Sequence, residues 1–124
     1  DIFYWSPFIS KVATVSSVIR SAQSIIKSKK KINVSFVDAI GEWEEYKDII
    51  DPKIQIIKLN NKNYYNKLPR DSYIKSRLSY IIIFFLNFNK LKNLINKKKP
   101  NFLIIHLMTV LPIFLTLFLK SNTK

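Results

Sequence analysis

The spacing of the apolar residues changes several times along this chain, and these changes constrain the fold more than any other feature. Residues 2–5 (IFYW) form a short continuous apolar run, which is typical of a buried strand. Between residues 12 and 26 the apolar side chains recur every three or four positions. This spacing predicts an amphipathic helix with a stripe of Val12, Val15, Val18, Ile19, Ala22, Ile25 and Ile26.

The two patterns continue to alternate through the rest of the chain. The runs at 32–37 (INVSFV) and 54–59 (IQIIKL) predict two more strands, separated by the loop DAIGEWEEYKD. From Ser72 to Lys97 the helical spacing returns in Ile74, Leu78, Ile81, Phe85, Phe88, Leu91, Leu94 and Ile95. After Pro100 the uninterrupted run NFLIIH suits a central strand buried on both faces, and LMTVLPIFLTLFLK predicts a last helix.

The order of these elements, β-α-β-β-α-β-α, predicts a mostly parallel, Rossmann-like α/β sheet with helices on both faces. With 124 residues, the chain is long enough for one such domain, residues 1–124. Ligands of open parallel sheets bind at the carboxyl ends of the strands. We therefore expect a binding loop at Ser6–Lys11, with Asp38, Gly41 and Glu42 after the second strand and His106 after the last one.

Charge and composition narrow the function classes. The formal net charge of +13 is compatible with nucleic acid or an anionic membrane as a partner. The runs Lys29–Lys31 and Lys97–Lys99 fall where helices end, and the aromatic residues fall in apolar runs, so we rank nucleic-acid binding last. The chain has no cysteine, which excludes disulfides and thiolate sites and is compatible with the cytoplasm. With one histidine and scattered acids, we expect no metal site.

Three stretches carry a resemblance to a known family. "FYWSPFISKVAT" at the first turn, "VDAIGEWEEY" after the second strand and above all "KKPNFLIIHLMTVLPIFLTLFL" resemble the N-terminal half of bacterial family-four glycosyltransferases of the GT-B type. The resemblance implies a retaining transferase that uses a nucleotide-sugar donor, without a further cofactor, and a cell-envelope glycan or lipid-linked acceptor. This half would hold the acceptor, at the cytoplasmic side of the membrane.

The resemblance also assigns a role to the only histidine. His106 matches the family's histidine at the end of the fourth strand, which faces the cleft near the transferred sugar, and we expect it to hydrogen-bond the donor sugar or the acceptor hydroxyl. A buried histidine satisfied by backbone groups is the alternative. The family's carboxylate pair belongs to the donor-binding half. Because the chain begins at Asp1, almost inside an apolar run, we expect a fragment that lacks this C-terminal half.

The first loop supplies further candidate acceptor-binding residues. It matches the family in position only, since Ser6-Pro7-Phe8 stands where many relatives carry a Gly-Gly pair. Lys11 either neutralises a phosphate or acidic sugar, or is a solvated surface lysine. Ser10 and Thr14 either contact sugar hydroxyls or cap the first helix.

The loop after the second strand carries the last candidates. Asp38 either points into the cleft or forms a turn. Glu42 shares this edge as a candidate acceptor contact, and a solvated acidic loop with Glu44 and Glu45 is the alternative. Trp43 either covers a sugar face or packs the loop onto the domain.

A small basic membrane protein without enzymatic activity is the alternative function. Residues 102–119 carry no formal charge at neutral pH over a length at the threshold for a spanning helix, although His106 and Pro112 interrupt them. Residues 78–88, together with Lys75, Arg77, Lys90 and Lys92, suit a lipid surface, and core packing explains the same apolar residues.

Overall fold

The computed structural model describes residues 1–11, 13–28, 31–106 and 117–118. These form β1 (Ile2–Trp5), α1 (Ala13–Lys27), β2 (Val34–Asp38), β3 (Gln55–Lys58), α2 (Tyr73–Lys98) and β4 (Phe102–Ile105), with short 3₁₀ helices at Glu44–Tyr46 and Tyr65–Lys67. The predicted order is confirmed through the fourth strand. The predicted last helix lies outside the described residues except for 117–118, as do Val12 and residues 29–30.

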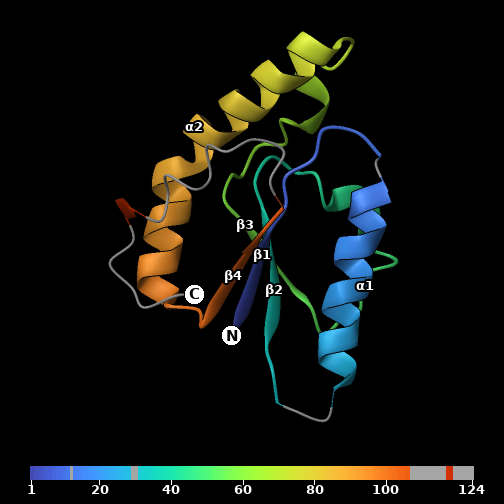
Figure 1. The fold of residues 1–124 in the computed structure, drawn as a ribbon, viewed down its shortest axis with the longest axis vertical. Helices are drawn as coiled ribbons and strands as arrows, with labels where there is room; N and C mark the ends of the chain where they lie inside the picture. Colours follow the sequence, from blue (N-terminus) through green and yellow to red (C-terminus); the bar gives the residue numbers. More distant parts are fainter. Residues whose placement is uncertain (12, 29–30, 107–116, 119–124) are drawn as a thin grey trace.

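The strands form one parallel sheet of four strands in the order β3-β2-β1-β4. The helices α1 and α2 cover opposite faces of this sheet (Figure 1). In register, Tyr4 lies beside Phe36 on one side and Ile104 on the other, which continues the apolar core across the strands. The predicted parallel, Rossmann-like α/β fold is confirmed.

The predicted position of the last strand is wrong. We expected NFLIIH to form a central strand, but β4 pairs only with β1 and is an edge strand of the described sheet. Phe102 is accordingly 49% exposed, and residues 103–105 are half-buried. The central strands are β1 and β2, where Phe3, Tyr4 and all of Val34–Asp38 are buried. An apolar run therefore indicates that a strand packs against other parts of the chain, but it does not show that the strand lies at the centre of the sheet.

Helix α1 packs on the sheet as its spacing predicts. Val15, Val18, Ile19 and Ala22 are buried beneath it, while Ile25 and Ile26 are half-buried near its end. The phenol of Tyr4 in β1 lies 2.8 Å from the hydroxyl of Ser21, so one polar contact joins the helix to the central strand. These contacts place the first turn of α1 close to the carboxyl end of the sheet, because helix and strands run in opposite directions (Figure 1).

Helix α2 forms where predicted. Leu91 and Ile95 of the predicted stripe are buried, but the first half of the helix buries a different face. Its buried residues are Ser79, Ile83, Phe84, Asn87, Leu91 and Ile95, whereas four members of the predicted stripe, Ile74, Leu78, Ile81 and Phe85, are exposed. The buried face includes two polar side chains because both are satisfied there: Ser79 donates to the Pro69 carbonyl at 2.5 Å, and Asn87 donates to the Ile83 carbonyl at 2.9 Å. Apolar spacing alone cannot recognise such a face.

The ends of α2 follow from local chemistry. Ser72 is the N-cap, and its hydroxyl accepts a hydrogen bond from the Lys75 backbone N–H at 3.3 Å. At the other end Lys99 adopts a left-handed backbone with φ of 47°, and its N–H donates to the Ile95 carbonyl at 2.7 Å. Pro100 follows directly and prevents further helix.

Candidate functional site

The strand order reverses between β1 and β4, because the chain leaves β1 toward β2 and β3 and returns through α2 to the free side of β1. Such a reversal separates the connections that follow the two strands and opens a crevice at their carboxyl ends. Trp5 pairs with Ile105, and the His106 backbone N–H donates to the Trp5 carbonyl at 3.3 Å. Ser6 and His106, which follow the paired residues, are therefore neighbours at this reversal.

Ser6 and His106 together form a small polar site, which we call the switch-point site. Ser6 is only 5% exposed, and its hydroxyl has no hydrogen-bond partner among the described residues. The side chain of His106 is half-buried, and its imidazole makes no hydrogen bond or ion pair within the described part of the chain. A buried hydroxyl without a partner is uncommon in folded proteins, and it suits a position where a ligand supplies the missing partner.

The middle of the predicted binding loop is structural. Phe8 and Ile9 are buried, and the Phe8 ring packs edge-on against Trp43, Tyr46 and Tyr65 at centroid distances of 5.1, 5.4 and 6.0 Å. These contacts anchor the loop to the segments that follow β2 and β3. Only the two ends of the loop, at Ser6 and at Ser10–Lys11, remain for ligand contact.

The other candidates around this loop lie at the surface. Ser10 and Lys11 are exposed, and the Lys11 ammonium lies 3.6 Å from the Glu45 carboxylate in an ion pair open to solvent. Pairs of this kind contribute little to stability, so Lys11 keeps its freedom to approach an anion. Thr14 is exposed inside the first turn of α1, so the prediction that Thr14 caps the helix is wrong.

Sequence reasoning missed Arg70, which fixes the first loop to the start of α2. Its guanidinium donates to the Ile9 carbonyl at 2.9 Å and to the Tyr65 carbonyl at 2.8 Å, and it lies over the Tyr65 ring at 5.1 Å. The backbone of Ile9 also bonds the phenol of Tyr80 in α2. Burial raises the pKa of this phenol, and the hydrogen bond with Ile9 lowers it. A lone arginine in a loop gives no sequence signal for such a role.

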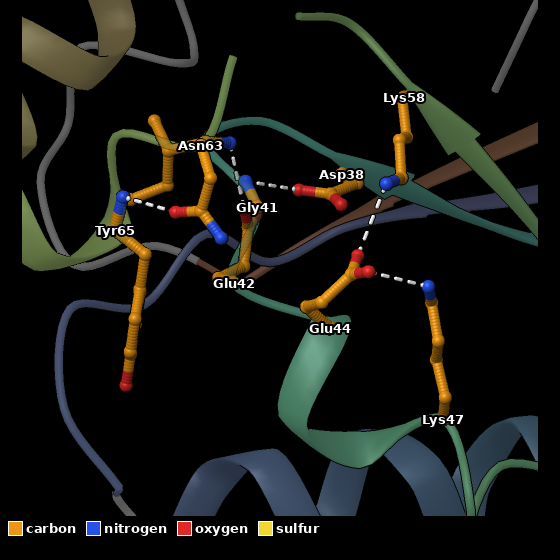
Figure 2. A network of polar contacts seen from close by, with 9 residues as sticks. Asp38, Gly41, Glu42, Glu44, Lys47, Lys58, Asn63 and Tyr65 are labelled. Carbon is orange, nitrogen blue, oxygen red and sulfur yellow. Dashed lines mark hydrogen bonds and ion pairs between the residues drawn. The ribbon is translucent and has the colours of Figure 1, made fainter. Parts of the chain in front are cut away.

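Asp38 and Glu42 form a buried carboxyl pair at the end of β2. Asp38 is 2% exposed and accepts a hydrogen bond from the Gly41 N–H at 2.6 Å, as Figure 2 shows. Glu42 is fully buried, and its two carboxyl oxygens accept from the backbone N–H groups of Ala39 at 3.0 Å and Ile40 at 2.7 Å. Both predictions for Glu42, an acceptor contact and a solvated loop residue, are therefore wrong: its carboxyl folds back onto the turn that carries it.

The proximity of Asp38 perturbs the titration of Glu42. Burial first, and then the hydrogen bond and the negative charge of Asp38, raise the pKa of Glu42 well above its ordinary value, against the lowering effect of the two backbone donors. Asp38 Oδ2 is buried and has no hydrogen-bond partner among the described residues, so the two carboxyl groups lie close together in a site with little access to water. Asp38 thus bonds the turn that follows β2, which agrees with the turn-forming alternative.

The next three residues of this loop differ in exposure: Glu44 and Glu45 lie in solvent, and Trp43 is buried. Glu44 and Glu45 are exposed, as a solvated loop requires, and Glu44 pairs with Lys47 at 2.6 Å and Lys58 at 3.0 Å (Figure 2). These two lysines lower the pKa of Glu44. Trp43 is fully buried and stacks on Phe36 at a centroid distance of 4.4 Å, so it packs the loop onto the domain and does not cover a sugar.

The turn after β2 is also held by the segment that follows β3. Gly41 has φ of +94° and lies against the Asn63 side chain, where an added Cβ would be 2.5 Å from Asn63 Cγ. Asn63 Oδ1 in turn accepts from the Tyr65 N–H at 2.9 Å (Figure 2). Farther along, the Asn60 amide donates to the Ala39 carbonyl and to Asn87 Oδ1, each at 2.7 Å. The loops behind the switch-point site are thus tied to one another and to α2.

A hollow of about 250 Å³ lies elsewhere, near the amino ends of β1, β2 and β3. Its lining includes Phe3, Ser35 and Gln55 together with two cations, Lys53 and Lys98. It is at the opposite end of the strands from the switch-point site and does not extend it. We give the switch-point site more weight, because strand topology and an unpartnered buried hydroxyl coincide there.

Neither a metal centre nor a spanning helix is present in the described part of the chain. Residues 1–11, 13–28, 31–106 and 117–118 contain no group of three acidic or histidine side chains placed to ligate a metal ion. Within these ranges no helix has both the length and the apolar character that crossing a bilayer requires. Comparison of the chain with protein-family models, curated proteins and solved structures found no match.

Proposed function

We propose that this chain is the acceptor-side half of a retaining glycosyltransferase that uses a nucleotide-sugar donor. The observation that supports this most is the adjacency of Ser6 and His106 at the strand-order reversal, with the Ser6 hydroxyl buried and unpartnered. The acceptor we propose is a cell-envelope glycan or a lipid-linked glycan, met in the cytoplasm at the inner face of the membrane.

The roles within the site follow from hydrogen-bonding capacity. Neutral imidazole both donates and accepts, so His106 can hold a sugar hydroxyl in a fixed orientation, and Ser6 can accept or donate a second hydrogen bond. The exposed Lys11 ammonium supplies positive charge near the first turn of α1. Positioning of the acceptor hydroxyl close to the donor's anomeric carbon is the main contribution expected of this half, since orientation alone lowers a barrier substantially.

Two predicted contacts are not part of this proposal. Asp38 and Glu42 are buried and hydrogen-bonded to the turn after β2, so we assign both carboxyls to the support of that turn. Stabilisation of the departing nucleotide diphosphate belongs to the proposed second half of the enzyme, and the exposed Lys11 in the first loop can assist it.

The single histidine makes the proposal testable by NMR without a full assignment. His106 gives a single imidazole Cε1–Hε1 signal in the labelled chain, and this signal reports occupancy of the switch-point site directly. We would titrate the chain with UDP-glucose, UDP-N-acetylglucosamine, GDP-mannose and a set of oligosaccharides. Because only half of a site is present, dissociation constants on the order of 1 mM are expected.

The expected result is a saturable shift of the His106 signal with at least one sugar ligand and none with inorganic pyrophosphate at the same concentration. Ser6→Ala should weaken that binding about fivefold, because it removes one hydrogen bond. Ser28→Ala, at an exposed position beyond α1, is the matched control and should bind as the unchanged chain does. A signal that no sugar ligand moves, or that Ser6→Ala leaves unaffected, would overturn the proposal.

A further inference from the structure

The first half of α2 presents apolar side chains to solvent along one side. Ile74 is 78% and Phe85 is 68% exposed, and the other members of this surface are Tyr73, Leu78, Ile81, Ile82 and Leu86. We call these residues the α2 stripe. Ile74, Leu78, Ile81 and Phe85 recur at helical spacing, so they form a continuous band about 18 Å long. Soluble monomers rarely expose a contiguous band of this kind without a partner.

The charges on α2 indicate what kind of partner fits the stripe. All its charged side chains are basic: Lys75, Arg77, Lys90, Lys92, Lys97 and Lys98. Since each residue advances the helix by about 100°, Lys75 and Arg77 lie on the two sides of Ile74 and Leu78. Arg77 lies 4.4 Å from the centre of the Tyr73 ring, which places an aromatic residue and a cation together at the start of the stripe.

We infer that the α2 stripe docks on an anionic lipid bilayer, with its apolar side chains at the boundary of headgroups and acyl chains and its cations against lipid phosphates. Apolar residues flanked by cations are the combination that lies in the membrane interface. A second copy of the chain fits less well, because it would bring one exclusively basic helix against another. The net charge of +13 adds long-range attraction to the same surface.

The position of the stripe favours a lipid-borne partner for the neighbouring site. α2 begins at the end of the molecule toward which the parallel strands run (Figure 1), and Arg70, just before it, binds the Ile9 carbonyl in the loop after β1. A bilayer at the stripe would therefore lie on the same end of the domain as Ser6 and His106. The inference does not depend on the transferase proposal, since docking requires neither a sugar nor a nucleotide.

The experiment measures binding of the 124-residue chain to vesicles of phosphatidylcholine with and without phosphatidylglycerol. We expect binding about tenfold or more tighter to the anionic vesicles, weakening as salt is added. Leu78→Ser and Phe85→Ser should each reduce binding about tenfold, because each removes a large side chain from the acyl boundary. Ile49→Ser is the matched control: Ile49 is 58% exposed but lies against α1, where Gln23 donates to its carbonyl.

A second readout separates insertion of the stripe from adhesion by charge alone. The chain has no cysteine, so Phe85→Cys and Ile49→Cys each accept a single polarity-sensitive fluorophore. We expect anionic vesicles to shift the emission to the blue at position 85 and leave it unchanged at position 49. Equal responses at both positions, binding that neither serine variant weakens, or self-association that Phe85→Ser abolishes in the absence of lipid would overturn the inference. Failure here would leave sugar binding at His106 unaffected, so the two proposals fail separately.

Discussion

Replacing Gly41 by alanine tests how tightly the turn after β2 is constrained. A side chain at φ of +94° is disfavoured for an L-residue by about 1–2 kcal/mol. The added Cβ would also lie 2.5 Å from Asn63 Cγ and 2.7 Å from Asn63 Nδ2. Relief of that overlap requires Asn63 to move, which removes its hydrogen bond to the Tyr65 N–H and about 1 kcal/mol more. We expect Gly41→Ala to lower the free energy of unfolding by about 2–3 kcal/mol in total.

Urea unfolding followed by tryptophan fluorescence measures this change, because Trp43 is buried two residues after Gly41. A loss of this size lowers the urea midpoint by about 1–2 M. The Asn63→Ala background supplies the control, since it removes the atoms that the new Cβ meets. There Gly41→Ala should lose only the backbone contribution of about 1–2 kcal/mol. An equal loss in both backgrounds, or a loss below about 0.5 kcal/mol, would refute the steric argument.

Three further outcomes follow from the buried polar groups. Because the folded state raises the pKa of Glu42, its contribution to stability is fully present below the ordinary glutamate pKa and is lost as pH rises through the raised value. Urea midpoints across this pH range should therefore fall for the unchanged protein and for Glu45→Gln, but not for Glu42→Gln; the same fall in Glu42→Gln would show that another group causes the pH dependence. Arg70→Lys keeps the charge but loses the forked contacts to two carbonyls, so the free energy of unfolding should drop by about 2 kcal/mol, and a neutral result would show that charge alone suffices. Asn87→Ala should lower the free energy of unfolding by about 1 kcal/mol because the half-buried Asn60 amide keeps the Ala39 carbonyl but loses Asn87 Oδ1 as an acceptor, whereas an unchanged or more stable variant would mean that this N–H bonds water instead.

The parts of the fold that the sequence predicts are those decided by neighbours close in the chain. The spacing of Val15, Val18 and Ile19 identifies both α1 and its buried face, because that helix has polar residues on its other side. The run IFYW identifies β1 for a similar reason, since a short bulky run bounded by Pro7 suits a buried strand better than a helix. Placement of His106 at the carboxyl edge of the sheet follows from the order of the elements, whereas the strand-order reversal beside it comes from the structure.

What the sequence did not reveal depends on contacts between distant segments. The face of α2 that packs inward is selected by Asn60 and Pro69, which satisfy Asn87 and Ser79 from outside the helix. Glu42 resembles the exposed Glu44 and Glu45 in sequence, and only the curvature of the turn around it determines that its carboxyl meets the Ala39 and Ile40 N–H groups. No local pattern contains that information.

The same long-range contacts link the two proposals physically. Arg70 holds Ile9 in the loop that begins at Ser6, and Asn60 joins the turn after β2 to Asn87 on the inward side of α2. The outward side of that helix is the α2 stripe. A bilayer that binds the stripe and orients α2 would therefore also orient the loops that these contacts join to the helix. A helix that needed only to support the sheet would gain nothing from Ile74 and Phe85 in solvent. Helix α2 hydrogen-bonds its buried polar side chains and exposes apolar ones to solvent. This arrangement is expected of a helix that packs on the sheet with one side and binds another partner with the other.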